Sequence, residues 1–246
     1  MTDIAIIGGT GLTQLETLDI LRKEVVHTPF GEASGPVTHG RLAGKDVAFI
    51  ARHGYGHTIP PHKVNYRANI WALKSVGAKS IIAVAAVGAI NRKLNPGTIA
   101  LPDQIIDYTY SRSQTYFEDD LDHVTHIDFT KPYSPELREK LVAAANKANI
   151  NFANGGTYGA TQGPRLETAA EIKRLERDGC DMVGMTGMPE AALARELELS
   201  YAAITVMANW AAGIVDGEIT MKEIQENLNA GMGDVKSIIQ NLISLI

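Results

Sequence analysis

The chain has 246 residues, 45% of them hydrophobic, so it is long enough to bury a large core in one domain spanning residues 1–246. Its formal net charge of −5, with both signs interspersed, argues against the basic face that nucleic-acid binding needs. The single cysteine, Cys180, excludes an internal disulfide framework and fits a reducing cytoplasm. The longest apolar stretch, around Ile81–Ile90, is too short to span a bilayer, and the strand-like start Ile4–Ile7 predicts no secretory signal.

Strand-like and helix-like segments alternate along the chain. In chain order we predict strands at Asp3–Ile7 and Asp46–Ala51, a helix at Val64–Val76, strands at Lys79–Val87 and Gly97–Leu101, helices at Ser134–Ala148, Glu167–Asp178 and Pro189–Leu197, a strand at Tyr201–Val206 and a helix at Thr220–Leu245. The polar stretch between Asp107 and Pro132 is predicted to be an irregular excursion that builds a rim or a subunit contact. This alternation indicates an α/β fold, a single domain whose twisted, mixed but largely parallel central sheet is flanked by helices.

Residues of unusual type cluster where the predicted strands end. In α/β folds the ligand lies beyond the carboxyl ends of the strands, so these positions are candidates for one common pocket. They are Gly8–Gly11, Arg52 with His53, Ala85–Gly88, Met185 with Thr186, and Asn209. Together they predict a site for an anion beside a heterocycle.

The segment Gly8–Gly11 is a candidate anion-binding loop, because glycines let backbone N–H groups approach an oxyanion and Thr10 adds a hydroxyl. Gln14 stands where a dinucleotide fingerprint would have its third glycine, and no Gly-Lys-Ser/Thr follows. A dehydrogenase and a P-loop enzyme are therefore disfavoured. Taken alone, the loop is equally well interpreted as a plain tight turn.

Arg52 and His53 directly follow a predicted strand, where a guanidinium fork can hold phosphate oxygens in bidentate fashion. Alone, the pair is better interpreted as a solvated turn. Asn209, before Trp210, can both donate to and accept from a heterocycle edge, although asparagine after a strand is more often a turn residue.

Four histidines outside these clusters lack the paired spacing of metal ligands, so no metal is expected. They are His57, His62, His123 and His126.

Four separated segments carry a resemblance to a known family: Arg52-His53-Gly54, Lys63–Leu73 (KVNYRANIWAL), Gln162–Thr168 (QGPRLET) and Gly184–Glu190 (GMTGMPE). The chain resembles the trimeric purine nucleoside phosphorylase and methylthioadenosine phosphorylase family over nearly its whole length, from Ile4 to about Ile239. The resemblance implies a nucleoside phosphorylase-like fold and a pentosyltransferase of purine salvage. It also implies inorganic phosphate as co-substrate, with no cofactor.

The resemblance also implies roles for individual residues. Positions matching the family's phosphate site are Thr10, Arg52, His53, the backbone of Ala85 and Ala86, and the Thr186 hydroxyl. Ala85 replaces the hydroxyl residue common in the family, so one phosphate contact is lost or supplied by water. Met185 matches the methionine that packs against the ribose, and Leu166 replaces an aromatic residue that faces the base. Catalysis would rest on Arg52 and His53 at the phosphate and on Asn209 near N7 of the purine, with no side-chain nucleophile.

Two positions are expected to read the base. An ionised Glu167 accepts a hydrogen bond from N1–H of a 6-oxopurine and repels the bare N1 lone pair of a 6-aminopurine. The methylthioadenosine enzymes have acidic residues at the positions of Asn209 and Ala211, and both are missing here. The base reader therefore resembles that of the inosine and guanosine branch.

The residues expected near the ribose 5′ position indicate a different branch of the family. Oxopurine-specific enzymes of the family place a histidine at the position of Met221, where it meets the ribose 5′-hydroxyl. Here Ile219, Met221 and Ile224 make the segment apolar, which suits a methylthio group. His126 matches a residue that reaches the neighbouring subunit's 5′ pocket in the methylthioadenosine branch. Met221 is alternatively a simple helix-core residue.

The combination of residues for a 6-oxopurine with an apolar wall at the 5′ position resembles the site of the bacterial methylthioinosine phosphorylases. The leading hypothesis is phosphorolysis of S-methyl-5′-thioinosine to hypoxanthine and 5-methylthioribose 1-phosphate. Methylthioadenosine phosphorylase and inosine/guanosine phosphorylase are the alternatives within the enzyme class, and a nucleoside-binding protein is the alternative outside it. The resemblance further implies a homotrimer, or a dimer of trimers.

Overall fold

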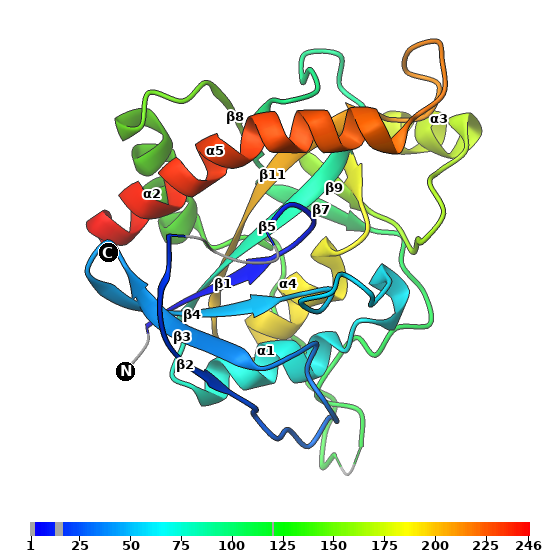
Figure 1. Ribbon diagram of the computed structural model, residues 1–246. Helices are drawn as coiled ribbons and strands as arrows, with labels where there is room; N and C mark the ends of the chain where they lie inside the picture. The colour runs from blue at the N-terminus through cyan, green and yellow to red at the C-terminus, as the bar shows by residue number, and fades with distance from the viewer. Residues whose placement is uncertain (1–2, 13–16, 120) are drawn as a thin grey trace.

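The computed structural model of the protein describes residues 3–12, 17–119 and 121–246 (Figure 1). Gln14, which argued against a dinucleotide fingerprint, lies outside the described residues. Within the described chain, eleven strands form one sheet. None of the described helices is both long enough and apolar enough to cross a membrane.

Four parallel strands form the centre of the sheet: β1 (Ile4–Gly8), β4 (Lys45–Ala51), β5 (Ser80–Ala89) and β11 (Ser200–Trp210). β1 lies between β4 and β5, and β11 pairs with β5 along its whole length. The side chains of these strands are almost all buried, as expected for near-continuous apolar runs covered on both faces.

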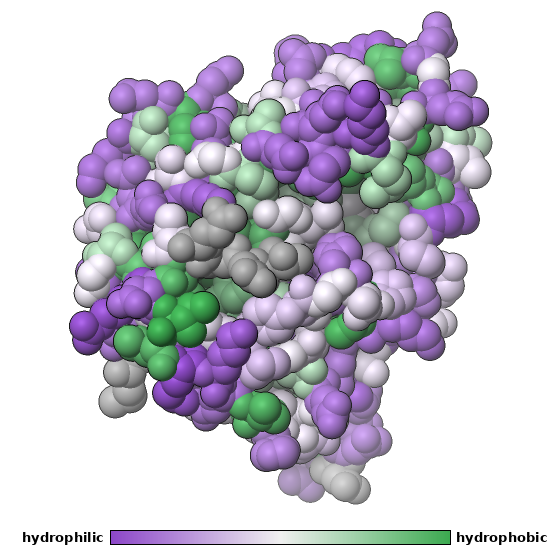
Figure 2. Space-filling view, in the orientation of Figure 1, coloured by the Kyte–Doolittle hydropathy of each residue, from purple (hydrophilic) through white to green (hydrophobic). Residues whose placement is uncertain are grey.

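Shorter strands extend this centre on both sides: β2 (Asp19–Glu24), β3 (Val37–Leu42), β6 (Ile99–Leu101), β7 (Gln104–Asp107), β8 (Phe152–Asn154), β9 (Thr157–Ala160) and β10 (Met182–Gly184). Antiparallel pairs join β2 to β3, β3 to β4, β10 to β5 and β11 to β6, whereas β6–β8, β7–β9 and β9–β10 are parallel. The predicted mixed, largely parallel sheet is therefore confirmed. On the face shown in Figure 2, apolar patches lie over the edge strand β2, whose Ile20 and Leu21 are exposed.

Helices cover both faces of the sheet. α1 (Tyr66–Ser75) and α4 (Gly187–Glu196) pack with one buried cluster, and α2 (Pro135–Lys147) and α5 (Met221–Leu245) pack with the other (Figure 1). α3 (Ala169–Arg177) packs with a third, smaller cluster. The α2 N-cap is Ser134, as predicted, and Thr168 forms a capping box with Glu171 at the start of α3.

The expectation that the site residues follow their strands was wrong for two of the clusters. β5 continues to Ala89 and β11 to Trp210, so Ala85–Gly88 and Asn209 lie inside strands. The strands continue because β5 and β11 remain paired beyond Val87, across a bulge between Met207 and Asn209. The predicted irregular excursion is confirmed, since no described residue from 108 to 134 belongs to a helix or strand.

Candidate active site

A cavity of about 390 Å³ opens where the central strands, the start of α4 and the start of α5 meet. Every residue assigned to a site from the sequence lines it, with the exception of His126. These lining residues are Thr10, Arg52, His53, Ala85, Ala86, Leu166, Glu167, Met185, Thr186, Asn209, Ala211, Met221 and Ile224. The topology thus brings together segments that are up to about two hundred residues apart in the chain.

Arg52 is the largest polar side chain buried at this cavity, being only 1% exposed. Its Nε and Nη2 donate to the two carboxylate oxygens of Glu190 at 2.7 and 2.8 Å, and its Nη1 donates to the carbonyl of Val84 at 2.9 Å. Burial lowers the pKa of Arg52, but the Glu190 carboxylate outweighs this effect and raises it above its ordinary value. A guanidinium has five N–H groups, so one on Nη1 and one on Nη2 remain for a ligand.

The loop after β1 lies directly over this guanidinium. A Cβ built on Gly9 would lie 2.5 Å from the Val84 carbonyl and 2.7 Å from Nη1 of Arg52. Glycine is therefore required for the backbone to approach the arginine so closely. Thr10 follows on this loop and lines the same cavity as Arg52, and its role as an anion ligand stays a prediction.

His53 has one ring nitrogen fixed by the backbone. Its Nδ1 lies 2.8 Å from the carbonyl of Ile59, which can only accept, so Nδ1 carries the proton. Burial, followed by the charge of Arg52, lowers the pKa of His53 to about 4. At neutral pH the ring is uncharged, and Nε2 is an acceptor. We call Thr10, Arg52 and His53 the arginine end of the cavity.

Glu167 and Asn209 also line the cavity, from the loop before α3 and from β11. One carboxylate oxygen of Glu167 accepts a hydrogen bond from the Thr161 hydroxyl at 2.7 Å, leaving the other oxygen available. Asn209 follows the β11 bulge and donates from Nδ2 to the Trp210 carbonyl at 2.7 Å. Its amide still has a second N–H and an oxygen to offer.

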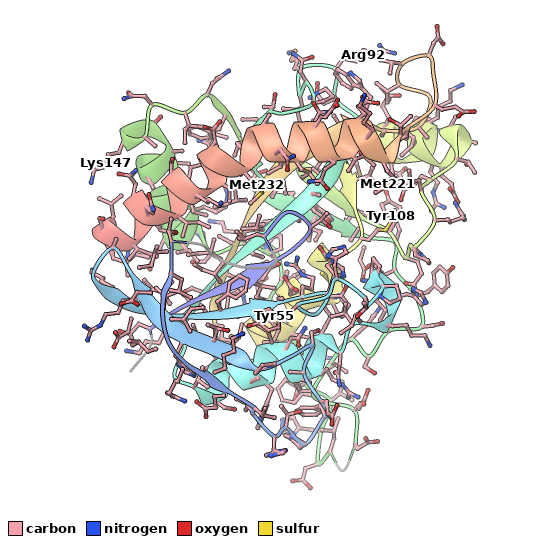
Figure 3. The ribbon with its side chains drawn as sticks, viewed as in Figure 1. Tyr55, Arg92, Tyr108, Lys147, Met221 and Met232 are labelled. Carbon is pink, nitrogen blue, oxygen red and sulfur yellow. The ribbon has the colours of Figure 1, made fainter. Side chains whose placement is uncertain are left out.

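Apolar side chains form the rim of the cavity, which we define as Leu166, Ile219, Met221 and Ile224. Leu166 is 44% exposed. Met221 is 75% exposed and is the first residue of α5 (Figure 3). The alternative that Met221 is a helix-core residue is therefore wrong. An apolar group held here would be covered on one side by these side chains.

His126 lies in the excursion, is exposed and does not line the cavity. Its predicted role in a neighbouring subunit's pocket stays a prediction. Among residues 3–12, 17–119 and 121–246, no three His, Cys, Asp or Glu side chains gather as metal ligands.

Comparison with known proteins shows to which family this chain belongs. A model of the Phosphorylase superfamily matches residues 3–244. The chain belongs to that superfamily. Over 244 residues, 99% of each chain, it is 56% identical to a protein of Pseudomonas syringae pv. tomato named probable S-methyl-5′-thioinosine phosphorylase. It is 45% identical to the 6-oxopurine nucleoside phosphorylase of Pyrococcus furiosus, covering 100% of this chain and 94% of that one.

A solved structure of the superfamily shares the fold over the whole chain. Methylthioadenosine phosphorylase from Schistosoma mansoni, in complex with adenine, matches with a TM-score of 0.95 at 30% identity. The match covers 100% of this chain and 92% of that one. The resemblance that the sequence motifs carried is thereby confirmed.

The structure of this superfamily member also reveals polar residues that sequence reasoning had not assigned. Glu190, 0% exposed, orients Arg52 and accepts a further hydrogen bond from the Tyr201 hydroxyl at 2.8 Å. One signal was available in the sequence, because a carboxylate inside the otherwise apolar stretch 187–194 of α4 needs a buried cation as partner. Thr161 had no comparable signal, since its contact with Glu167 depends on how one loop folds back.

Proposed function

We propose that this enzyme of the purine nucleoside phosphorylase type catalyses phosphorolysis of S-methyl-5′-thioinosine, giving hypoxanthine and 5-methylthioribose 1-phosphate. One observation carries the proposal: Glu167 and Asn209 line the same cavity as the apolar rim residues Ile219, Met221 and Ile224. The first pair suits a 6-oxopurine, and the rim suits a 5′-methylthio group. The name of the relative with 56% identity supports this combination.

Phosphate would bind at the arginine end. The two free N–H groups of Arg52, the Thr10 hydroxyl and the Thr186 hydroxyl are donors for its oxygens. His53 is neutral, with Nε2 an acceptor, so it would accept a hydrogen bond from the O–H of a hydrogen phosphate ion. Ala85 and Ala86 would contribute backbone groups.

The reaction breaks the bond between C1′ of the sugar and N9 of the purine. Positive charge develops on the sugar, where the bound phosphate stabilises it before a phosphate oxygen bonds to C1′. The purine leaves with the bonding electrons, and a hydrogen bond from the Asn209 amide to N7 stabilises that charge. The proton that hydrogen phosphate loses when its oxygen bonds to C1′ ends on the departing purine, which gives neutral hypoxanthine. Holding the phosphate and C1′ in line converts a bimolecular step into an intramolecular one.

The remaining substrate contacts follow from their places in the cavity. The free oxygen of Glu167 would accept from N1–H, Met185 would pack against the ribose, and Leu166 would cover the base in place of an aromatic ring. Ala211, beside Gly88, leaves room where a carboxylate would repel O6. We further propose a cytoplasmic homotrimer in which His126 reaches a neighbour's pocket, with phosphate as co-substrate and no cofactor.

Steady-state kinetics on methylthioinosine, methylthioadenosine and inosine, each with saturating phosphate, test the proposal. Methylthioinosine should have the largest kcat/KM. A preference for methylthioadenosine would overturn the base assignment, and a preference for inosine would overturn the 5′ assignment. Phosphorolysis of inosine is the second candidate function, because the Pyrococcus relative is a 6-oxopurine nucleoside phosphorylase.

The alternative outside the enzyme class was a nucleoside-binding protein without activity. It is disfavoured because pure nucleoside recognition does not need the buried arginine end. Calorimetry showing nucleoside binding without phosphate-dependent turnover would favour it.

A further inference from the structure

Arg112 belongs to the irregular excursion after β7, yet its half-buried side chain points inward to the backbone behind the cavity. It does not line the cavity itself. Its guanidinium donates to Gln162 Oε1 (3.1 Å), the Tyr66 hydroxyl (3.3 Å), and the carbonyls of Met185 (2.8 Å), Met188 (2.7 Å), Thr161 (3.2 Å) and Gln162 (2.8 Å).

The four carbonyl groups belong to two neighbouring segments that both line the cavity. One segment, 161–167, follows β9 and carries Leu166 and Glu167. The other, 184–188, leads from β10 into α4 and carries Met185 and Thr186. The backbone N–H of Thr161 bonds to the Gly184 carbonyl at 2.8 Å, and beyond that point the segments leave the sheet. Beyond the sheet, Arg112 bonds to the backbone of both segments and so ties them together.

An arginine suits this position for a geometric reason. Its planar fork presents five N–H groups in fixed directions, whereas a lysine ammonium offers three donors from one point. The Tyr66 ring lies 5.4 Å from the guanidinium carbon and provides an aromatic face for it. In the described part of the chain Arg112 makes no ion pair, so its charge is directed at carbonyl oxygens.

We propose that Arg112 is a positioning residue: it sets the spacing between the wall that bears Glu167 and the wall that bears Met185 and Thr186. The inference rests on the proposed function, in which the first wall holds the purine and the second holds the ribose and phosphate. A shift of one wall against the other displaces the base from the reacting C1′. Misplacement by about 1 Å can lower a rate about 100-fold.

The test uses the full-length enzyme with methylthioinosine and phosphate. Arg112→Ala should lower kcat/KM for the nucleoside about 100-fold, with a smaller change in the phosphate KM, because Arg52 keeps its Glu190 partner. Methylguanidinium added to the assay should restore part of the lost rate by occupying the space left by the side chain. The matched control is Arg174→Ala, an exposed arginine outside the cavity, which should stay within about twofold of wild type.

The outcomes separate the inference from the proposed function. Wild-type protein inactive on all three nucleosides would overturn the proposed function. An active wild type with an equally active Arg112→Ala variant would overturn only the inference, and so would a loss that methylguanidinium does not restore. Should Arg112→Ala fail to fold, Arg112→Lys carries the prediction, because it keeps the charge but loses the fork. We expect it to lose about tenfold in kcat/KM at an unchanged Tm, and wild-type activity would contradict us.

Discussion

The arginine end and the rim of one cavity are built in opposite ways. At the arginine end, Arg52 is 1% exposed and is held by a carboxylate that is 0% exposed, on a helix more than a hundred residues away. At the rim, Leu166 and Met221 are 44% and 75% exposed. Changing the first disturbs the core, whereas changing the second alters only what the cavity admits. Substrate preference can therefore diverge within the superfamily while anion binding stays fixed.

The largest effect is expected from Glu190→Gln, which leaves the buried charge of Arg52 without its counter-charge. Removing one partner of a buried pair costs about 3–5 kcal/mol, so the free energy of unfolding in urea should fall by that amount. Added phosphate should stabilise the variant more than the wild type, because the anion supplies the missing negative charge.

Glu171→Gln is the control for that variant. Glu171 pairs with Arg165 at the surface, where ion pairs contribute about 0–1 kcal/mol, and glutamine can still close the capping box at Thr168. Equal losses in the two variants would mean that the arginine end is no more dependent on its ion pair than the surface is.

The next largest effect is expected at Glu167 and Asn209, the residues proposed to bind the base. The double variant Glu167→Ser, Asn209→Asp should shift the ratio of kcat/KM for methylthioinosine over methylthioadenosine toward methylthioadenosine by about 10³-fold. A site with mispaired buried polar groups discriminates by up to about 10⁴–10⁵. A ratio that stays flat, with both substrates still turned over, would show that these residues do not read the base.

The sequence predicted the buried elements of the fold better than the exposed and short ones. Apolar periodicity predicted β1, β4, β5 and the helices, because a strand or helix covered by the core must be apolar in a regular pattern. The strands β2, β3 and β7–β10 were missed. β2 is exposed at the sheet edge, and β8 and β10 have three residues each, too few to show a period.

The site was predicted as a set of residues but not as a network. Arg52, His53 and Asn209 were assigned by their motifs, and all three line the cavity. Their partners were not assigned: Glu190 leaves only the weak signal of a carboxylate in a buried stretch of helix, and the choice of the Ile59 and Trp210 carbonyls as acceptors depends on how the loops fold. Arg112 was missed for the same reason, since it acts on backbone carbonyls from a segment without regular structure.

A third prediction concerns pH at the arginine end. The pKa of His53 is about 4 in the folded protein against an ordinary value of 6.5, so between these values the unfolded chain binds more protons. The contribution of neutral His53 to the free energy of unfolding is fully present above pH 6.5. It should be lost as pH falls to 4, by up to about 3 kcal/mol. Urea unfolding in phosphate-free buffers should show this slope in the wild type and a shallower one in His53→Gln. Parallel slopes would mean that His53 is not kept neutral by burial.

The smallest effect is expected at the rim, from Met221→His. The new side chain can hydrogen-bond the 5′-hydroxyl of inosine, a contact worth about 1 kcal/mol, and it replaces an apolar surface that suits a methylthio group. The ratio of kcat/KM for inosine over methylthioinosine should rise by about tenfold, with no change in urea stability because Met221 is 75% exposed. Val215→His is the control, because Val215 is exposed nearby in the chain but does not line the cavity. If both variants leave the ratio unchanged, residue 221 does not contact the 5′ group, and the substrate preference must be set deeper in the cavity, nearer the arginine end.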